Sequence, residues 1–222
     1  MKTYINSSNL NLEIIFQVMK KRIAKGFKSS DLSFLIGKEH NYIDGVESLV
    51  TPSYTTQDLN FISEALEEQI NPSPDDTDIK EYPLFINIER HLFESRYFHI
   101  CTSYSSVGHA HVYFILTEDA DLRPKPVFAQ MQYDQHDLVK QKIGAMRDEG
   151  YFEQPKWPYQ IYQHISRTLG LTIDPRLLKD LLDDFCLGDG LGGLKKQYDN
   201  DRYQYVFNAT RIRSILAKSK SL

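Results

Sequence analysis

Apolar residues recur at spacings of three and four from Leu12 to Leu66, and this period constrains the fold more than any other feature. Gly26, Gly37, Gly45 and the turn at 51–53 interrupt it, so no single helix can span the segment. Ser29 or Ser30 can cap a helix that begins near Asp31. We therefore predict several short helices around one core, with apolar faces built from Ile15, Val18, Met19, Ile23, Leu32, Leu35, Ile36, Leu59, Ile62 and Leu66.

The order of features within residues 18–66 resembles a known family. A basic first helix leads to a step formed by Gly26, Phe27 and Ser29, and then to the acidic-Leu pair Asp31-Leu32. Leu-Ile-Gly stands at the turn, and a Pro-containing loop precedes a closing Leu-x-x-Ile-x-x-Ala-Leu. This string, about a fifth to a quarter of the chain, resembles the Xre/Cro class of lambda-repressor-like helix-turn-helix domains.

The resemblance implies DNA binding, because such a domain lays its second helix in the major groove while the first crosses the backbone. Lys25, Lys28 and Ser30 would then contact the DNA backbone and so position the protein on it, and His40 and Asn41 would contact base edges. The full set of residues that the resemblance places at DNA is Lys25, Lys28, Ser30, Lys38, His40, Asn41 and Asp44, with Glu39 and Gly45 also facing the groove.

Two features of this segment oppose DNA binding and leave an alternative open. The family usually has Gln at the position of Ser30 and often a basic residue at the position of Gly45. Glu39, Asp44 and Glu47 add negative charge that phosphate repels, although Glu47 occupies a position where the family often has Glu for structural reasons. The alternative is a protein-protein interaction or adaptor module with a degenerate helix-turn-helix that does not bind DNA.

The net charge of −4 is unevenly distributed along the chain. Residues 1–50 hold 7 Lys/Arg against 5 Asp/Glu, residues 51–150 hold 8 against 17, and residues 151–222 hold 11 against 8. The acidic middle would be repelled by phosphate, whereas the weakly basic ends could approach it. Any contact with nucleic acid is therefore expected at the ends of the chain.

The middle of the chain changes from helical to alternating periodicity. Residues 67–83 are rich in Pro, Asp and Ser and read as an exposed linker. Beyond them, residues 96–106 and 109–118 flank a turn at Val107-Gly108, and residues 126–133 form a third candidate strand. We predict a small antiparallel sheet.

The C-terminal part is similar in layout to winged-helix domains. Helical stretches follow one another, and the last begins at Asp174 and Pro175. A hairpin is expected around Asp199-Asn200-Asp201, and "GYFEQPKWPYQIYQHI" resembles the step that opens the second helix of many such domains. The third helix and the wing tip are acidic, which favours a structural or partner-binding role. The domain order also resembles proteins of Bacteroidetes bacteria that carry no assigned function.

Other candidate sites have weaker support in the sequence. His99, Cys101, His109 and His111 could be zinc ligands by residue type, but strand histidines in an aromatic sheet more often form half-buried hydrogen bonds. The glycines of residues 188–193 predict a turn. A phosphate-binding loop follows a strand and precedes a helix, and the sequence predicts neither at these places. Neither a cofactor nor an enzymatic centre is predicted. Cys101 and Cys186 are expected to be reduced, buried thiols in different domains.

These observations predict a mainly α, α+β protein. We expect a four- to five-helix helix-turn-helix domain at 1–68, a linker at 69–82, a small antiparallel β segment at 83–135 and a winged-helix-like domain at 136–222. The expected function is sequence-specific DNA binding in transcription regulation, with duplex DNA as partner. A homodimer is expected because one small helix-turn-helix buries little DNA. The sequence contains neither an apolar stretch of membrane-spanning length nor a signal peptide, so we expect a cytoplasmic protein.

Overall fold

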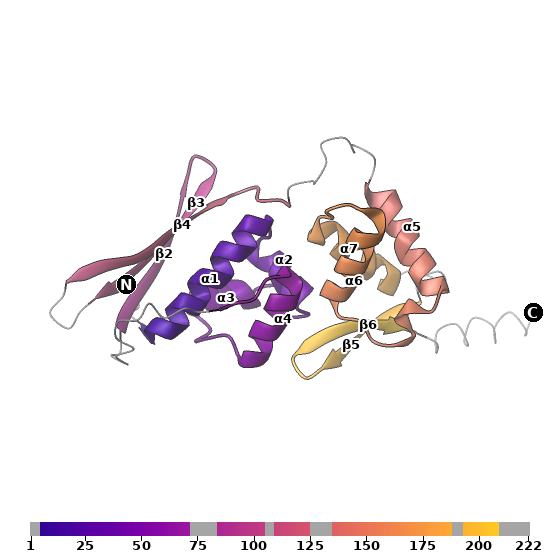
Figure 1. The fold of residues 1–222 in the computed structure, drawn as a ribbon, viewed down its shortest axis with the longest axis horizontal. Helices are drawn as coiled ribbons and strands as arrows, with labels where there is room; N and C mark the ends of the chain where they lie inside the picture. Colours follow the sequence, from indigo (N-terminus) through magenta and orange to yellow (C-terminus); the bar gives the residue numbers. More distant parts are fainter. Residues whose placement is uncertain (1–4, 72–83, 105–108, 125–134, 188–192, 209–222) are drawn as a thin grey trace, which may run out of the picture. The chain divides into compact units, whose positions relative to one another are not determined.

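The computed structural model describes residues 5–71, 84–104, 109–124, 135–187 and 193–208. It has a mixed α+β fold that is mainly helical, which confirms the predicted class (Figure 1). The chain divides into two compact units. One comprises Met1–Leu32 and His40–Arg123, and the other comprises Ser33–Glu39 and Pro124–Leu222. None of the helices in the described ranges is long and apolar enough to cross a membrane.

Four short helices follow one another near the N-terminus, within the predicted number. They are α1 (Asn9–Lys25), α2 (Ser29–Leu35), α3 (Tyr42–Glu47) and α4 (Thr56–Leu66). Gly26 ends α1 in the left-handed region at φ 80°, and Thr55 and Asp58 form a capping box on α4. The apolar residues of this periodic segment form a core in the first unit. The buried side chains include Leu12, Ile15, Val18, Met19, Leu32, Ile43, Val46, Ile62 and Leu66.

A four-stranded antiparallel sheet belongs to the same unit as these helices. Its strands β1 (Ile5–Ser7), β2 (Leu84–Phe93), β3 (Arg96–Tyr104) and β4 (Ala110–Asp119) lie in that order. The sequence predicted β3 and β4 but neither β1 nor β2. The expected turn at Val107-Gly108, the candidate strand at 126–133 and residues 72–82 of the expected linker lie outside the described residues.

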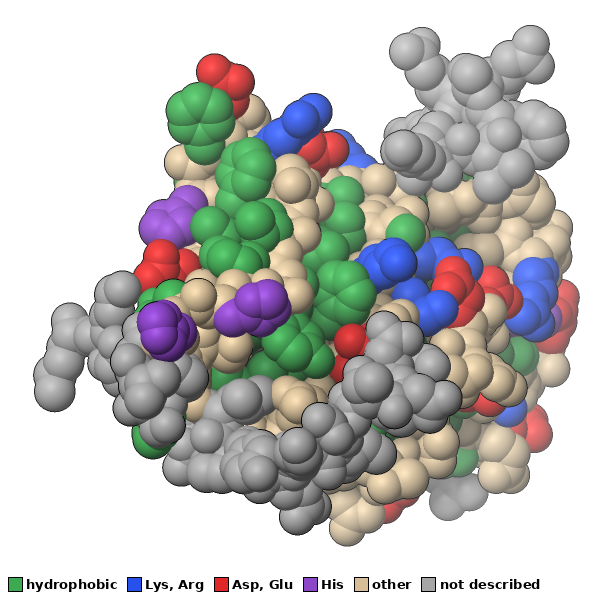
Figure 2. Space-filling model, turned by 60° about the vertical axis from the view of Figure 1, so that its left-hand side comes forward, with side chains coloured by type: hydrophobic (Ala, Val, Ile, Leu, Met, Phe, Trp, Pro, Cys, Tyr) green, Lys and Arg blue, Asp and Glu red, His purple; other side chains and the backbone are tan. Residues whose placement is uncertain are grey.

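The two faces of the sheet differ. The inner face packs on α1, where the rings of Phe16 and Phe114 are 5.2 Å apart. The opposite face, which we call the outer face, carries hydrophobic side chains that reach solvent (Figure 2). Strand register assigns it Phe85, Phe98, Ile100, Val112 and Ile115.

Within its described residues, the second unit has three helices followed by a hairpin, as predicted. The helices are α5 (Gln135–Asp148), α6 (Pro158–Leu169) and α7 (Pro175–Leu187), with a 3-10 turn, η1, at Tyr151–Glu153. The hairpin is β5 (Leu194–Asp199) and β6 (Arg202–Phe207). Pro starts both α6 and α7. The first residue of a helix has no intrahelical partner for its backbone N–H, so the missing N–H of Pro costs no hydrogen bond there. The buried side chains of α7 include Leu178, Leu181 and Leu182, which lie on its predicted apolar face.

Residues 33–39, which end α2 and turn away from it, group with this second unit. The Tyr203 N–H donates to the Gly37 carbonyl at 2.8 Å. Gly37 has a φ of 71°, and a Cβ added there would lie 2.5 Å from the Tyr203 carbonyl oxygen. Only glycine fits this approach, because it alone combines the left-handed backbone with the missing side chain.

We expect Gly37→Ala to lower the free energy of unfolding by at least about 1 to 2 kcal/mol, from the left-handed backbone alone. Thermal unfolding followed by circular dichroism measures the loss. Gly144→Ala is the matched control, because Gly144 lies inside α5 with nothing within 4 Å of an added Cβ. It should be neutral or stabilising by up to about 1 kcal/mol. Equal effects of the two substitutions would contradict the close approach at Gly37.

Candidate nucleic-acid interface

A buried ion network fixes α1 and α3 of the first unit. The Arg22 guanidinium is 1% exposed and donates to both oxygens of Glu47, at 2.5 and 2.6 Å. It also donates to the Phe27 carbonyl at 3.1 Å, next to the start of α2. This bidentate pair holds the end of α3 against α1, so it determines where the polar side chains at the start of α3 lie.

The same arginine ties the sheet to the helices. Arg22 Nη2 donates to Glu118 Oε2 at 2.9 Å, and His99 Nε2 lies 3.0 Å from that oxygen. Burial alone would lower the pKa of Arg22, but the Glu47 and Glu118 carboxylates raise it well above its ordinary value. Burial alone would raise the pKa of Glu118, but hydrogen bonding to His99 and the charge of Arg22 lower it to about 2. Arg22 and Glu118 are therefore both charged at neutral pH.

Five of the seven residues that the resemblance placed at DNA line a single cleft of about 290 Å³ in this unit. The start of α2, the start of α3 and the strands β2 to β4 all contribute to its walls. The lining residues are Lys28, Ser29, Ser30, His40, Asn41, Asp44, Arg90, Tyr97, Glu118 and Ala120.

The sheet contributes a base to this cleft that sequence reasoning did not single out. Arg90 on β2 lies over the ring of Tyr97, 3.8 Å from its centroid, and its Nη1 is 3.5 Å from Asp44 Oδ1. The ion pair is half exposed and contributes about 0 to 1 kcal/mol to stability. Its larger consequence is electrostatic, because it offsets the negative charge of Asp44 at the surface that phosphate would approach.

Two of the predicted DNA contacts lie elsewhere. Lys25 ends α1 and is half-buried outside the cleft. Lys38 is only 6% exposed and forms an ion pair with Asp201 of the hairpin, within the second unit. Its ammonium group lowers the pKa of the Asp201 carboxyl. The sequence placed Lys38 at DNA because it follows the turn of the motif, but that position is buried here.

The cleft can present hydrogen-bond donors and bases to an anionic partner. Asn41 occupies the N-cap of α3 without making a capping hydrogen bond through its side chain, and both Asn41 and His40 are exposed. Lys28 and Arg90 line the same cleft and supply positive charge. An exposed amide in a cleft with two cationic side chains suits a surface that contacts phosphate and base edges together.

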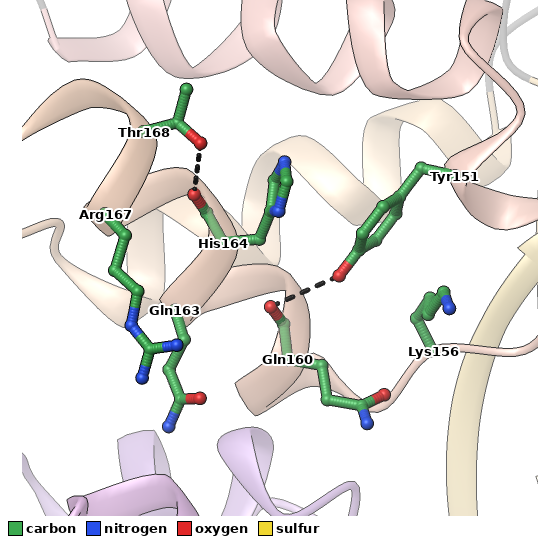
Figure 3. Close-up of a pocket in the computed structure, with 7 residues that line it drawn as sticks. All are labelled: Tyr151, Lys156, Gln160, Gln163, His164, Arg167 and Thr168. Carbon is green, nitrogen blue, oxygen red and sulfur yellow. Dashed lines mark hydrogen bonds between the residues drawn. The ribbon is translucent and has the colours of Figure 1, made fainter.

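A second polar cavity, of about 330 Å³, lies along α6 in the second unit (Figure 3). Lys156 Nζ lies 5.0 Å from the centroid of the Tyr151 ring, which in turn is 4.8 Å from the ring of His164. Burial, together with the charge of Lys142, lowers the pKa of His164. Helical spacing of polar residues could have revealed this surface in the sequence. Its lining residues are Tyr151, Lys156, Gln160, Gln163, His164, Arg167 and Thr168, none of them acidic.

The four residues considered as zinc ligands differ in burial and do not form one cluster. His99 and Cys101 are buried on the inner face, with His99 bound to Glu118, whereas His109 and His111 are exposed. Across the part of the chain that the structure describes, no group of three or more His, Cys, Asp or Glu residues could hold a metal ion. The glycines at 188–192 lie outside the described residues.

Comparison with family models, with curated proteins and with solved structures gives no match for this chain.

Proposed function

We propose that this protein is a sequence-specific DNA-binding transcriptional regulator that acts through an Xre-like helix-turn-helix in the cytoplasm. The observation that carries the proposal is the convergence of Lys28, Ser30, His40, Asn41 and Asp44 on one cleft. These positions come from the resemblance of residues 18–66 to a family that binds duplex DNA through its second helix. Their clustering supports a common contact surface.

The charge of the cleft also supports DNA as the partner. Asp44 is offset by Arg90, and the buried Glu118 accepts a hydrogen bond from Arg22. Lys28 adds positive charge to the cleft that the exposed Asn41 and His40 also line. In this proposal Lys28 and Arg90 contact phosphate, and Asn41 and His40 contact base edges.

A second candidate is a protein-protein interaction module built on the same helices. The observation that favours it is the burial of Lys38 in an ion pair with Asp201. This burial removes one positively charged side chain from the expected DNA surface. Glu39 and Asp44 remain exposed, and Asp44 lines the cleft. A basic protein segment would suit such a surface better than phosphate does.

Titration of labelled duplex DNA at several salt concentrations distinguishes the two candidates. We expect Lys28→Ala to weaken binding to the preferred site and to random DNA by the same factor. The slope of log affinity against log salt should fall by about one ion, because each phosphate contact releases roughly one counterion. Lys140→Ala, an exposed site on α5, is the control and should leave both quantities unchanged. A salt slope unaffected by Lys28→Ala would remove this residue from the DNA surface.

A further inference from the structure

The strand β4 forms an edge of the four-stranded sheet and has unusual composition for an edge. Among the described residues it pairs with β3 alone. Charged side chains, Pro or a β-bulge on an exposed edge discourage pairing with another chain. In β4 the register shift lies at Tyr113, and the acidic residues Glu118 and Asp119 lie at the end of the strand. Between them, Phe114–Thr117 pairs regularly with β3 and contains neither a charged residue nor Pro, which leaves a straight stretch of edge.

The opposite edge is protected in a way that β4 is not. β1 covers the first part of β2 by pairing with Leu84, Phe85 and Ile86. The rest of β2 carries Glu89, Arg90 and His91 in mid-strand, where charges discourage pairing, whereas the acidic residues of β4 lie at its end. The contrast indicates that β4 is the edge available for association.

The outer face of the sheet adds an apolar surface that continues to this edge. Ile115 is 56% exposed and Val112 is 49% exposed, and both lie on β4. Half-buried Ile100 pairs with Ile115 across the β3–β4 ladder. Hydrophobic side chains that gather in this way on a monomer surface mark interaction sites (Figure 2).

We propose that β4 pairs antiparallel with β4 of a second copy of this chain, joining two four-stranded sheets into one across a two-fold axis near Ile115. Identical edge strands satisfy each other's backbone N–H and C=O groups through such an axis, because a two-fold interface uses the same surface on both copies. The two outer faces then form one continuous apolar surface. The inference concerns self-association alone and does not depend on DNA binding.

The ends of β4 favour an antiparallel pair of identical strands. His111 stands near the start of the strand, and the exposed Asp119 ends it. Antiparallel pairing brings the His111 end of one copy beside the acidic end of the other. Parallel pairing would instead place the two acidic ends together, where like charges repel each other. The strand itself therefore selects a second copy in the opposite direction.

Sedimentation velocity of the full chain at tens of micromolar tests the proposal. The wild type should sediment as a dimer, and Ile115→Lys should raise the dimer dissociation constant at least about 30-fold, as expected at an interface centre. Leu92→Lys is the control, because Leu92 is also exposed but lies on β2. It should leave the dimer intact. A wild type that sediments as a monomer overturns the proposal.

A cysteine cross-link locates the axis without relying on a disruptive variant. In a Cys186→Ser background, Ile115→Cys should form a covalent dimer on mild oxidation, because paired residues across two strands suit disulfide geometry. Burial raises the pKa of the native Cys101 thiol to about 12, which keeps it unreactive. His91→Cys, on the same face but on β2, should not cross-link. Cross-linking through His91→Cys but not through Ile115→Cys would overturn edge pairing in favour of face-to-face packing.

Discussion

Replacing Arg22 by methionine is expected to lower the free energy of unfolding by about 3 to 5 kcal/mol, the largest effect that we predict for a single substitution. The guanidinium is the cation that Glu47 and Glu118 share, and each of these carboxylates is 4% exposed. Its removal leaves two buried carboxylates without their cation. Urea unfolding followed by circular dichroism measures the change, and Lys20→Met, on the exposed side of α1, should change stability by less than about 0.5 kcal/mol.

A second substitution separates lost charge neutralisation from lost packing. Adding Glu47→Leu to Arg22→Met should recover part of the stability, because an apolar pair avoids the cost of an unpaired buried charge. If the double variant is no more stable than Arg22→Met, the network stabilises the unit through packing alone.

The network also predicts how wild-type stability depends on pH. The folded-state pKa of Glu118 is lowered from 4.5 to about 2. A lowered carboxyl pKa contributes stability above pH 4.5 that is lost as pH falls toward 2. Arg22→Met removes part of the cause, so its stability should fall less over the same range. A steeper loss of stability in the variant would contradict this assignment.

Asn41→Ala is expected to weaken binding to the preferred DNA site by about 1 to 3 kcal/mol while leaving binding to random DNA almost unchanged. The physical reason is the loss of a bidentate amide contact with a base edge, which carries discrimination and little general affinity. Competition titrations with specific and random duplexes measure both affinities. The effect should not arise through unfolding, because the Asn41 side chain makes no capping hydrogen bond on α3.

The control for Asn41 is Ser48→Ala at the other end of α3, where the hydroxyl donates to the Asp44 carbonyl at 2.7 Å. This side chain is exposed and lies outside the cleft, so both affinities should be unchanged. Equal losses on specific and random DNA for Asn41→Ala would assign Asn41 to the phosphate backbone instead of a base.

The helices and the hairpin could be predicted because local chemistry specifies them. Gly26 ends α1, Pro175 starts α7, and Asn200 supplies a φ of 57° at the turn of the hairpin. Each signal lies within a few residues of its consequence. β2 was not predicted because Glu89, Arg90 and His91 interrupt its apolar pattern in mid-strand. Its pairing with β3 is set by a register that the pattern of one strand does not specify.

The sequence predicted the residues of the candidate site that lie within one continuous segment. It did not predict the residue that only folding brings to the site. Lys28, Asn41 and Asp44 fall within the motif and do line the cleft. Arg90 reaches the same cleft from a strand about fifty residues away in sequence, and no spacing rule connects it to α3. Lys38 shows the converse, because a motif position that suits DNA contact became buried beside Asp201.

Selection of binding sites from a random duplex pool with the purified full chain tests the central proposal most directly. We expect a defined consensus sequence to be enriched at low salt, and the consensus should lose one specified position when the selection is repeated with Asn41→Ala. Enrichment of no sequence at low salt, together with no gain in affinity when Glu39 and Asp44 are both replaced by Gln, would contradict DNA recognition and favour the interaction module.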